Sequence, residues 1–98
     1  MRERKYYVYI STNKNNEVLY VGVSNSMIRR SWEHKSKVYD NSFTEKYNIN
    51  KMVYYEIWGD VKQAIFREKQ IKNLLRKKKI DLINKVNPSW VDVMDMIE

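Results

Sequence analysis

The chain contains no cysteine, one histidine, one proline and two glycines among its 98 residues. The lack of cysteine excludes a disulfide-stapled fold and a thiolate metal site. With a single histidine, a zinc centre would depend on carboxylates for its other ligands, so a zinc site is not expected. No apolar run reaches the ~20 residues of a membrane span, and the N-terminus has no signal-peptide pattern. We therefore expect a soluble, cytoplasmic protein that does not contact a membrane.

The residues that are abundant indicate a folded, basic domain. Hydrophobic residues make up 43% of the chain and aromatic residues 13%, which is typical of a globular protein and predicts a single domain over residues 1–98. Lysine and arginine number 19 against 12 acidic residues, which gives a net charge of +7. This charge favours a polyanionic partner, although a basic surface that binds nothing charged explains it as well.

The order of the predicted elements points to an α+β fold. Three segments have the alternation and β-branched or aromatic residues of strands, and three have helical periodicity. A small three-stranded antiparallel sheet flanked by helices follows from this order. In the first strand, Tyr7 and Tyr9 are expected to share one face of the sheet. We expect strands over 5–11, 18–23 and 51–58, and helices over about 27–38, 61–75 and 77–85.

The predicted helix over 61–75 carries a carboxylate within its apolar stripe. Glu68 lies near the middle of that stripe and Lys72 lies at its edge. A carboxylate on a core-facing stripe is costly unless it is paired or binds a metal. An i,i+4 pair between Glu68 and Lys72 that reaches the surface explains the pattern, and so does a functional site. The stripe consists of Val61, Ala64, Ile65, Ile71 and Leu75.

Scarce residues gather in the stretch "LYVGVSNSMIRRSWEH", residues 19–34, which reads as strand, glycine and helix. It holds Gly22 and the single histidine, His34. Arg30, His34 and Lys37 are three and four residues apart and fall on one side of the predicted helix. Alone, this arrangement also fits a solvated helix face, and the later basic run from Arg76 to Lys79 has the same two interpretations.

Together, these features resemble the GIY-YIG nuclease superfamily, especially its small single-domain members, over about residues 5–93. The first family motif corresponds to "YVY", Tyr7 to Tyr9, and the second to "YVG", Tyr20 to Gly22, with ten residues between Tyr9 and Tyr20. Tyr7 stands where the family has glycine, and both motifs have valine for isoleucine. The family's arginine, histidine, glutamate and late asparagine correspond to Arg30, His34, Glu68 in "AIFREKQIK" and Asn87 in "NPSW".

The resemblance implies a metal-dependent endonuclease that hydrolyses phosphodiester bonds in double-stranded or branched DNA. Glu68 would hold one Mg²⁺ or Mn²⁺ ion, and Arg30, with His34 beside it, would bind the scissile phosphate. Tyr9 or Tyr20 would activate or orient water. Tyr7, Gly22 and Asn87 would support the site. The basic residues that would contact the DNA backbone are Arg29, Lys37, Lys72, Arg76, Lys77, Lys78 and Lys79.

Two other functions remain open at this point. A nucleic-acid-binding module could keep the fold without cutting, and a protein-interaction domain could carry its positive charge incidentally. Retention of the tyrosines, arginine, histidine and glutamate favours the nuclease. No obligate protein partner is evident, and a monomer is the default expectation for a domain of this size.

Overall fold

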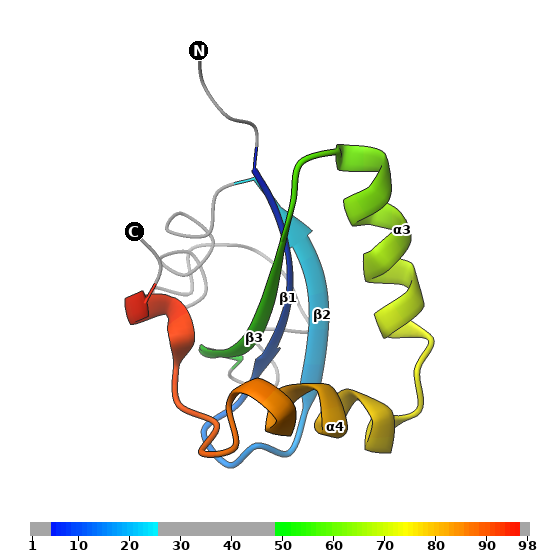
Figure 1. Ribbon diagram of the computed structural model, residues 1–98. Coiled ribbons are helices and arrows are strands. Elements are labelled where there is room, and N and C mark those ends of the chain that lie inside the picture. The colour runs from blue at the N-terminus through cyan, green and yellow to red at the C-terminus, as the bar shows by residue number, and fades with distance from the viewer. Residues whose placement is uncertain (1–4, 26–48, 97–98) are drawn as a thin grey trace.

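The computed structural model describes residues 5–25 and 49–96. Its centre is a three-stranded antiparallel sheet of β1 (Tyr6–Thr12), β2 (Leu19–Ser24) and β3 (Lys51–Trp58), shown in Figure 1. The strand order is β2-β1-β3, so β1 is central and β2 and β3 are the two edge strands. The predicted strands and the α+β fold are confirmed.

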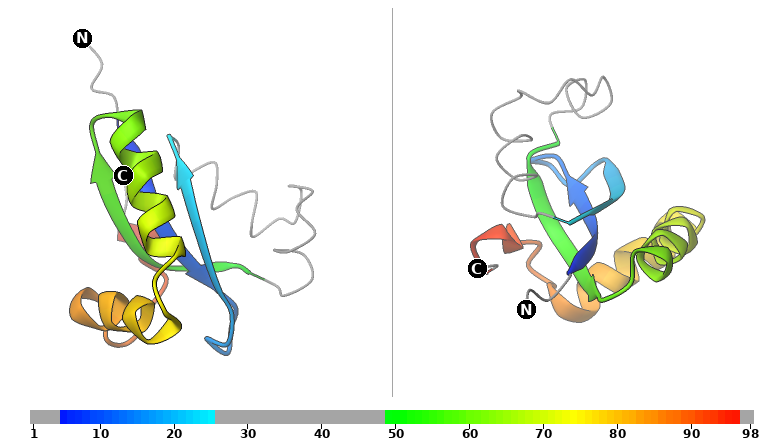
Figure 2. Two further views of the ribbon diagram at one scale, coloured as in Figure 1. Left: turned by 90° about the vertical axis from the view of Figure 1, so that its right-hand side faces the viewer. Right: turned by 90° about the horizontal axis from the view of Figure 1, so that it is seen from above.

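Two α-helices and a short 3₁₀-helix follow the sheet: α3 (Val61–Lys72), α4 (Arg76–Val86) and η1 (Val93–Met96). α3 and η1 lie on opposite sides of the sheet, and α4 runs across one of its ends (Figures 1 and 2). Within the two described stretches, no helix has the length and apolar character that crossing a membrane requires. The helix predicted over 27–38 lies outside the described residues.

α3 begins where the sequence indicates but ends three residues before the predicted position 75. Its N-cap is Asp60, whose Oδ1 accepts a hydrogen bond from the Lys62 amide at 3.1 Å. After Lys72 the chain leaves the helix, and Leu75 becomes the N-cap of α4.

The predicted apolar stripe of α3 is wrong in part. Ala64 and Ile71 are fully buried, but Val61 and Ile65 are each 41% exposed. Leu75 is 76% exposed because it lies beyond the end of the helix. α3 therefore contacts the sheet through a narrow apolar line rather than through the whole stripe.

The two faces of the sheet build two separate clusters. Val8 and Ile10 of β1 pack with Ala64 and Ile71 of α3 on one face. Tyr7 and Tyr9 of the same strand pack on the other face, with Met94 of η1 among their neighbours. This division follows from the two-residue period of a strand and confirms the predicted common face of Tyr7 and Tyr9.

A β-bulge in β3 decides which of its side chains face α3. Opposite β1, the register passes from Ile10 paired with Tyr54 to Ser11 paired with Met52, so Val53 is an extra residue. Val53 and Tyr54 consequently both join the cluster under α3, whereas Met52 belongs to the cluster of the tyrosine face.

Asn87 ties this bulge to the C-terminal segment. Its side chain is buried, and its Nδ2 donates to the carbonyl oxygens of Val53 and Val91 at 2.9 Å each. Its Oδ1 accepts from the Val91 amide at 3.2 Å. A bulge interrupts the ladder of its strand, and Asn87 supplies a donor to a carbonyl in that position. The structure thus places Asn87 as a clamp between β3 and the turn that follows α4.

Replacement of Asn87 by alanine is expected to lower the free energy of unfolding by roughly 1–3 kcal/mol, because the buried carbonyl of Val53 loses its hydrogen-bond partner. Urea unfolding monitored by circular dichroism measures this loss. Asn84→Ala is the matched control, since Asn84 is exposed and its Oδ1 accepts from the Trp90 Nε1 at the surface. Equal stabilities of the two variants would contradict the clamp.

Candidate active site at the edge of the sheet

Tyr9 lies at the centre of the sheet with its hydroxyl directed toward the edge strand. It is 1% exposed and pairs with Gly22 on β2 and Tyr55 on β3. A Cβ atom at Gly22 would lie 2.5 Å from the Tyr9 hydroxyl oxygen, so the phenol end of Tyr9 covers the Gly22 backbone. Glycine is therefore required here by close approach of a side chain.

Tyr20 completes the tyrosine pair of the two motifs. Its ring centroid lies 6.4 Å from that of Tyr9, with the ring planes tilted by 42°. Tyr20 is half-buried on β2, whereas Tyr9 is enclosed. The two motif tyrosines and Gly22 are thus brought together at the edge strand, as their spacing predicts.

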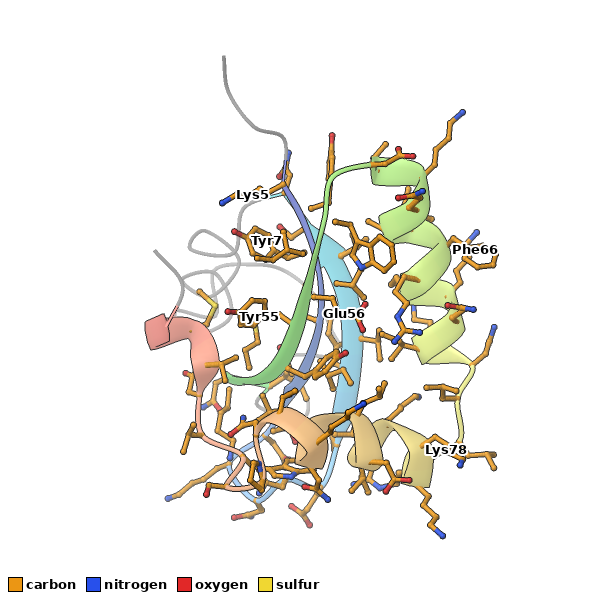
Figure 3. All side chains as sticks on the ribbon, viewed as in Figure 1. Lys5, Tyr7, Tyr55, Glu56, Phe66 and Lys78 are labelled. Carbon is orange, nitrogen blue, oxygen red and sulfur yellow. The ribbon has the colours of Figure 1, made fainter. Side chains whose placement is uncertain are left out.

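Tyr7 packs beside this pair rather than crowding the strand. It is 9% exposed, and its ring centroid lies 6.1 Å from that of Tyr55. Both rings extend to the side of the sheet opposite α3 (Figure 3). The side chain that replaces the family's glycine is therefore accommodated as part of the core.

Glu68 lies on α3 at the margin of its buried line. Its side chain is 15% exposed, and one turn on either side the helix presents the buried Ala64 and Ile71. Lys72 Nζ lies 3.4 Å from Glu68 Oε2, so the i,i+4 ion pair considered from the sequence is present. Because the Lys72 side chain is 60% exposed, such a pair contributes only about 0–1 kcal/mol.

A second ion pair shows toward which strand Glu68 is turned. Arg67 Nε and Nη2 donate to the carboxylate of Glu56 on β3 at 2.9 to 3.1 Å, so Arg67 occupies the β3 flank of α3. The next residue lies about 100° further around a helix. With Ala64 and Ile71 facing the sheet between them, Glu68 falls on the opposite flank. It therefore points toward β2, the strand that carries Tyr20 and Gly22.

The Glu56 carboxylate accepts hydrogen bonds from three side chains, and it is absent from the sequence-based predictions. Besides Arg67, it accepts from the Trp58 Nε1 at 3.0 Å and from the Tyr54 hydroxyl. Burial alone would raise the pKa of Glu56, but these hydrogen bonds and the Arg67 charge outweigh it and lower the pKa. Burial and the bond to Glu56 raise the pKa of Tyr54 to about 12. The alternation Tyr54-x-Glu56-x-Trp58 was the available signal.

Acid is expected to remove the contribution of Glu56 to stability. Because its pKa is lower in the folded than in the unfolded chain, its contribution is complete above the unfolded value of about 4.3 and is lost as pH falls through the folded value. Glu56→Gln should lower the unfolding free energy by about 1–3 kcal/mol at pH 7. Thermal melts between pH 7 and 2 should show this difference shrinking below pH 4, and a constant difference would contradict the assignment.

Four of the basic residues predicted to contact nucleic acid form the first turn of α4. Arg76, Lys77 and Lys78 are exposed, and Lys79 is half-buried. α4 has no acidic residue in its first turn and no side-chain hydrogen bond at its N-cap, so its positive end adds to the charge of these side chains. Arg76 Nη2 also donates to the Asn16 carbonyl at 3.4 Å.

Four predicted site residues, Arg29, Arg30, His34 and Lys37, lie outside the described residues. Within residues 5–25 and 49–96, no group of three or more histidine, cysteine, aspartate or glutamate side chains is placed to hold a metal. A single carboxylate at Glu68 fits a hard cation that keeps most of its water ligands, as Mg²⁺ does.

Similarity to known proteins identifies the family of this chain. The family model of the GIY-YIG catalytic domain matches residues 5–81. The chain therefore belongs to the GIY-YIG nuclease superfamily. The chain is 34% identical to a UPF0213 protein of Syntrophus aciditrophicus over 86% of its own length and 94% of that protein. It is 35% identical to a UPF0213 protein of Clostridium perfringens over 80% of its own length and 82% of that protein.

A solved structure supports the fold. The solution NMR structure of a UPF0213 protein from Bacillus halodurans matches with a TM-score of 0.57 and 22% identity, over 95% of this chain and 97% of that one. The names of these relatives state no reaction or substrate. The similarity therefore establishes the class of domain and the fold, and it does not assign a substrate.

Proposed function

We propose that this protein is a metal-dependent endonuclease that hydrolyses DNA phosphodiester bonds at the β2 edge of its sheet. The observation that carries the proposal is the direction of three side chains toward one strand. Tyr9 reaches over Gly22 from β1, Tyr20 lies on β2 itself, and Glu68 faces β2 from α3. The tyrosines and α3 lie on opposite faces of the sheet, so the proposal requires the phosphate to lie across the β2 edge, between the tyrosine face and Glu68.

In the reaction, the oxygen of water bonds to phosphorus and the bond from phosphorus to a sugar oxygen breaks. Tyr20 is better placed than the enclosed Tyr9 to orient the water, because Tyr20 is only half-buried. Arg30 and His34, which the family pattern assigns to the phosphate, would hold its oxygens by charge-assisted hydrogen bonds. Bound at Glu68, Mg²⁺ or Mn²⁺ would supply charge stabilisation for the phosphate and leaving oxygens.

DNA would be held by the basic turn at the start of α4. Arg76, Lys77 and Lys78 are exposed there, and Lys78 is labelled in Figure 3. Contacts to phosphates position DNA without reading its sequence. We therefore expect weak sequence preference, with double-stranded or branched DNA as substrate.

A second function is favoured by the ion pair at Glu68. The Lys72 ammonium lies 3.4 Å from this carboxylate and pairs with it without a metal ion. The same ion pair is expected in a protein that binds DNA without cutting it. In the cutting enzyme, the exposed Lys72 side chain turns away to solvent when a cation binds, which a surface pair permits at little cost.

Cleavage assays on supercoiled plasmid and on branched duplexes separate the two functions. The nuclease predicts nicked product with Mg²⁺ or Mn²⁺ and none in EDTA. Retarded but intact DNA under all metal conditions would overturn the nuclease in favour of the binding module. Binding that does not weaken as salt rises would argue against both, because phosphate contacts are salt-dependent.

A further inference from the structure

α3 is held against the sheet by a small apolar contact and by an ion pair with precise geometry. Only two residues of the helix, Ala64 and Ile71, are buried. Val61 and Ile65, which would widen the apolar contact, are 41% exposed. Because only Ala64 and Ile71 are fully buried, the apolar contact alone specifies the rotation of the helix about its own axis weakly.

The ion pair between Arg67 and Glu56 fixes the rotation of α3 about its own axis. The guanidinium makes a two-pronged contact with the carboxylate, at 2.9 Å for both Nε to Oε1 and Nη2 to Oε2. Such planar contacts fix orientation as well as distance. Each partner is also held from elsewhere, Arg67 by Gln70 at 3.3 Å and Glu56 by Trp58 at 3.0 Å. Glu56 lies on the α3 side of β3 in Figure 3.

We propose that Arg67 and Glu56 are positioning residues for Glu68. By fastening the β3 flank of α3, the pair sets the helix rotation that directs Glu68 to the β2 edge. This inference rests on the proposed function, because Glu68 is the carboxylate assigned to the reaction there. A rotation of 30° would move a side chain at the helix surface by about 3 Å, enough to separate a ligand from its site.

The test compares three variants on the same helix. Arg67→Met keeps the aliphatic part of the side chain and removes the guanidinium group. Arg67→Lys keeps the charge but cannot make the two-pronged contact. Lys69→Met is the matched control, since it removes one positive charge from an exposed neighbouring position. At saturating DNA and Mg²⁺, the cleavage rate should fall by roughly 10–100-fold in Arg67→Met, less in Arg67→Lys, and within about threefold in Lys69→Met.

A distance measurement provides a readout that does not depend on activity. The chain has no cysteine, so spin labels can be attached at Phe66→Cys and Asn50→Cys alone. Phe66 is 66% exposed on α3, and the Asn50 amide is tied to the Thr12 carbonyl beside the sheet. Double electron–electron resonance should give one narrow distribution of label-to-label distances in the labelled parent and in Lys69→Met. In Arg67→Met the distribution should broaden or shift by about 3 Å or more.

The outcomes separate the two proposals. A parent protein that cuts no DNA overturns the proposed function, while the label distances still decide whether the pair sets the helix. An Arg67→Met protein with the parental rate, or with parental distances, overturns the positioning role and leaves the nuclease intact. If Arg67→Met does not fold, Glu56→Gln, which keeps the side-chain shape, takes its place with the same expected results.

Discussion

Glu68→Gln is expected to lower metal-dependent cleavage by at least roughly 10³-fold while the fold is retained, because an ion that stabilises charge in the reaction by several kcal/mol loses its carboxylate ligand. The substitution keeps the shape of the side chain and removes an ion pair with a largely exposed lysine. The melting temperature should therefore change little. Initial rates of plasmid nicking and a thermal melt of the same preparation measure both quantities.

Lys72→Met breaks the same ion pair from its other side and is the control for a purely structural role of Glu68. We expect weaker DNA binding by Lys72→Met but a rate at saturating DNA within a few-fold of the parent. If Glu68→Gln and Lys72→Met lose the same amount of activity, Glu68 acts only as a partner of Lys72. If Glu68→Gln unfolds, the carboxylate supports the core instead.

Gly22→Ala is expected to reduce cleavage by roughly 100-fold, because the new methyl group displaces the Tyr9 phenol and shifts the reacting groups by up to an ångström. The added Cβ would lie 2.5 Å from the Tyr9 hydroxyl oxygen and 2.6 Å from the carbon that bears it. Tyr9 is 1% exposed and has no room to retreat freely. Overpacking of this kind also lowers stability by about 1–3 kcal/mol.

Gly59→Ala is the control for the general effect of replacing glycine. A Cβ at Gly59 meets nothing within 4 Å, so this variant should keep parental activity and stability. The comparison uses cleavage rates at saturating DNA together with urea unfolding. Parental cleavage by Gly22→Ala would show that the hydroxyl of Tyr9 has no part in the reaction and would remove Tyr9 from the site.

The residues at the tyrosine face could be predicted from the sequence because local rules place them. Alternation along β1 predicts that Tyr7 and Tyr9 share one face, and the predicted hairpin brings the strand of Tyr20 and Gly22 beside β1, where Gly22 pairs with Tyr9. Glu68 was found for the opposite reason, as a carboxylate in an apolar stripe. Its ion pair with Lys72 is the structural explanation of that pattern, and its direction toward β2 is the basis on which we propose it for the site.

The parts that could not be predicted depend on contacts between segments far apart in the chain. The bulge at Val53 changes which β3 side chains face α3, and no turn or glycine signals it. Arg67 meets Glu56 only once that helix lies on the sheet. Asn87 is predicted to support the site, and its Nδ2 donates to the bulge carbonyl of Val53, a contact between segments 34 residues apart in the chain. The stripe on α3 was overestimated, because Ala64 and Ile71 are buried against the sheet while Val61 and Ile65 are each 41% exposed.

The measurement that tests the central claim most directly is titration of Mn²⁺ into the isotopically labelled protein, followed by paramagnetic broadening of its amide signals. A metal site shared by α3 and the edge strand predicts that signals of Glu68, Tyr20 and Gly22 broaden first. The same titration of Glu68→Gln should leave them sharp at equal Mn²⁺. Broadening that begins elsewhere, or that is the same in Glu68→Gln, would contradict a metal-dependent site at the β2 edge.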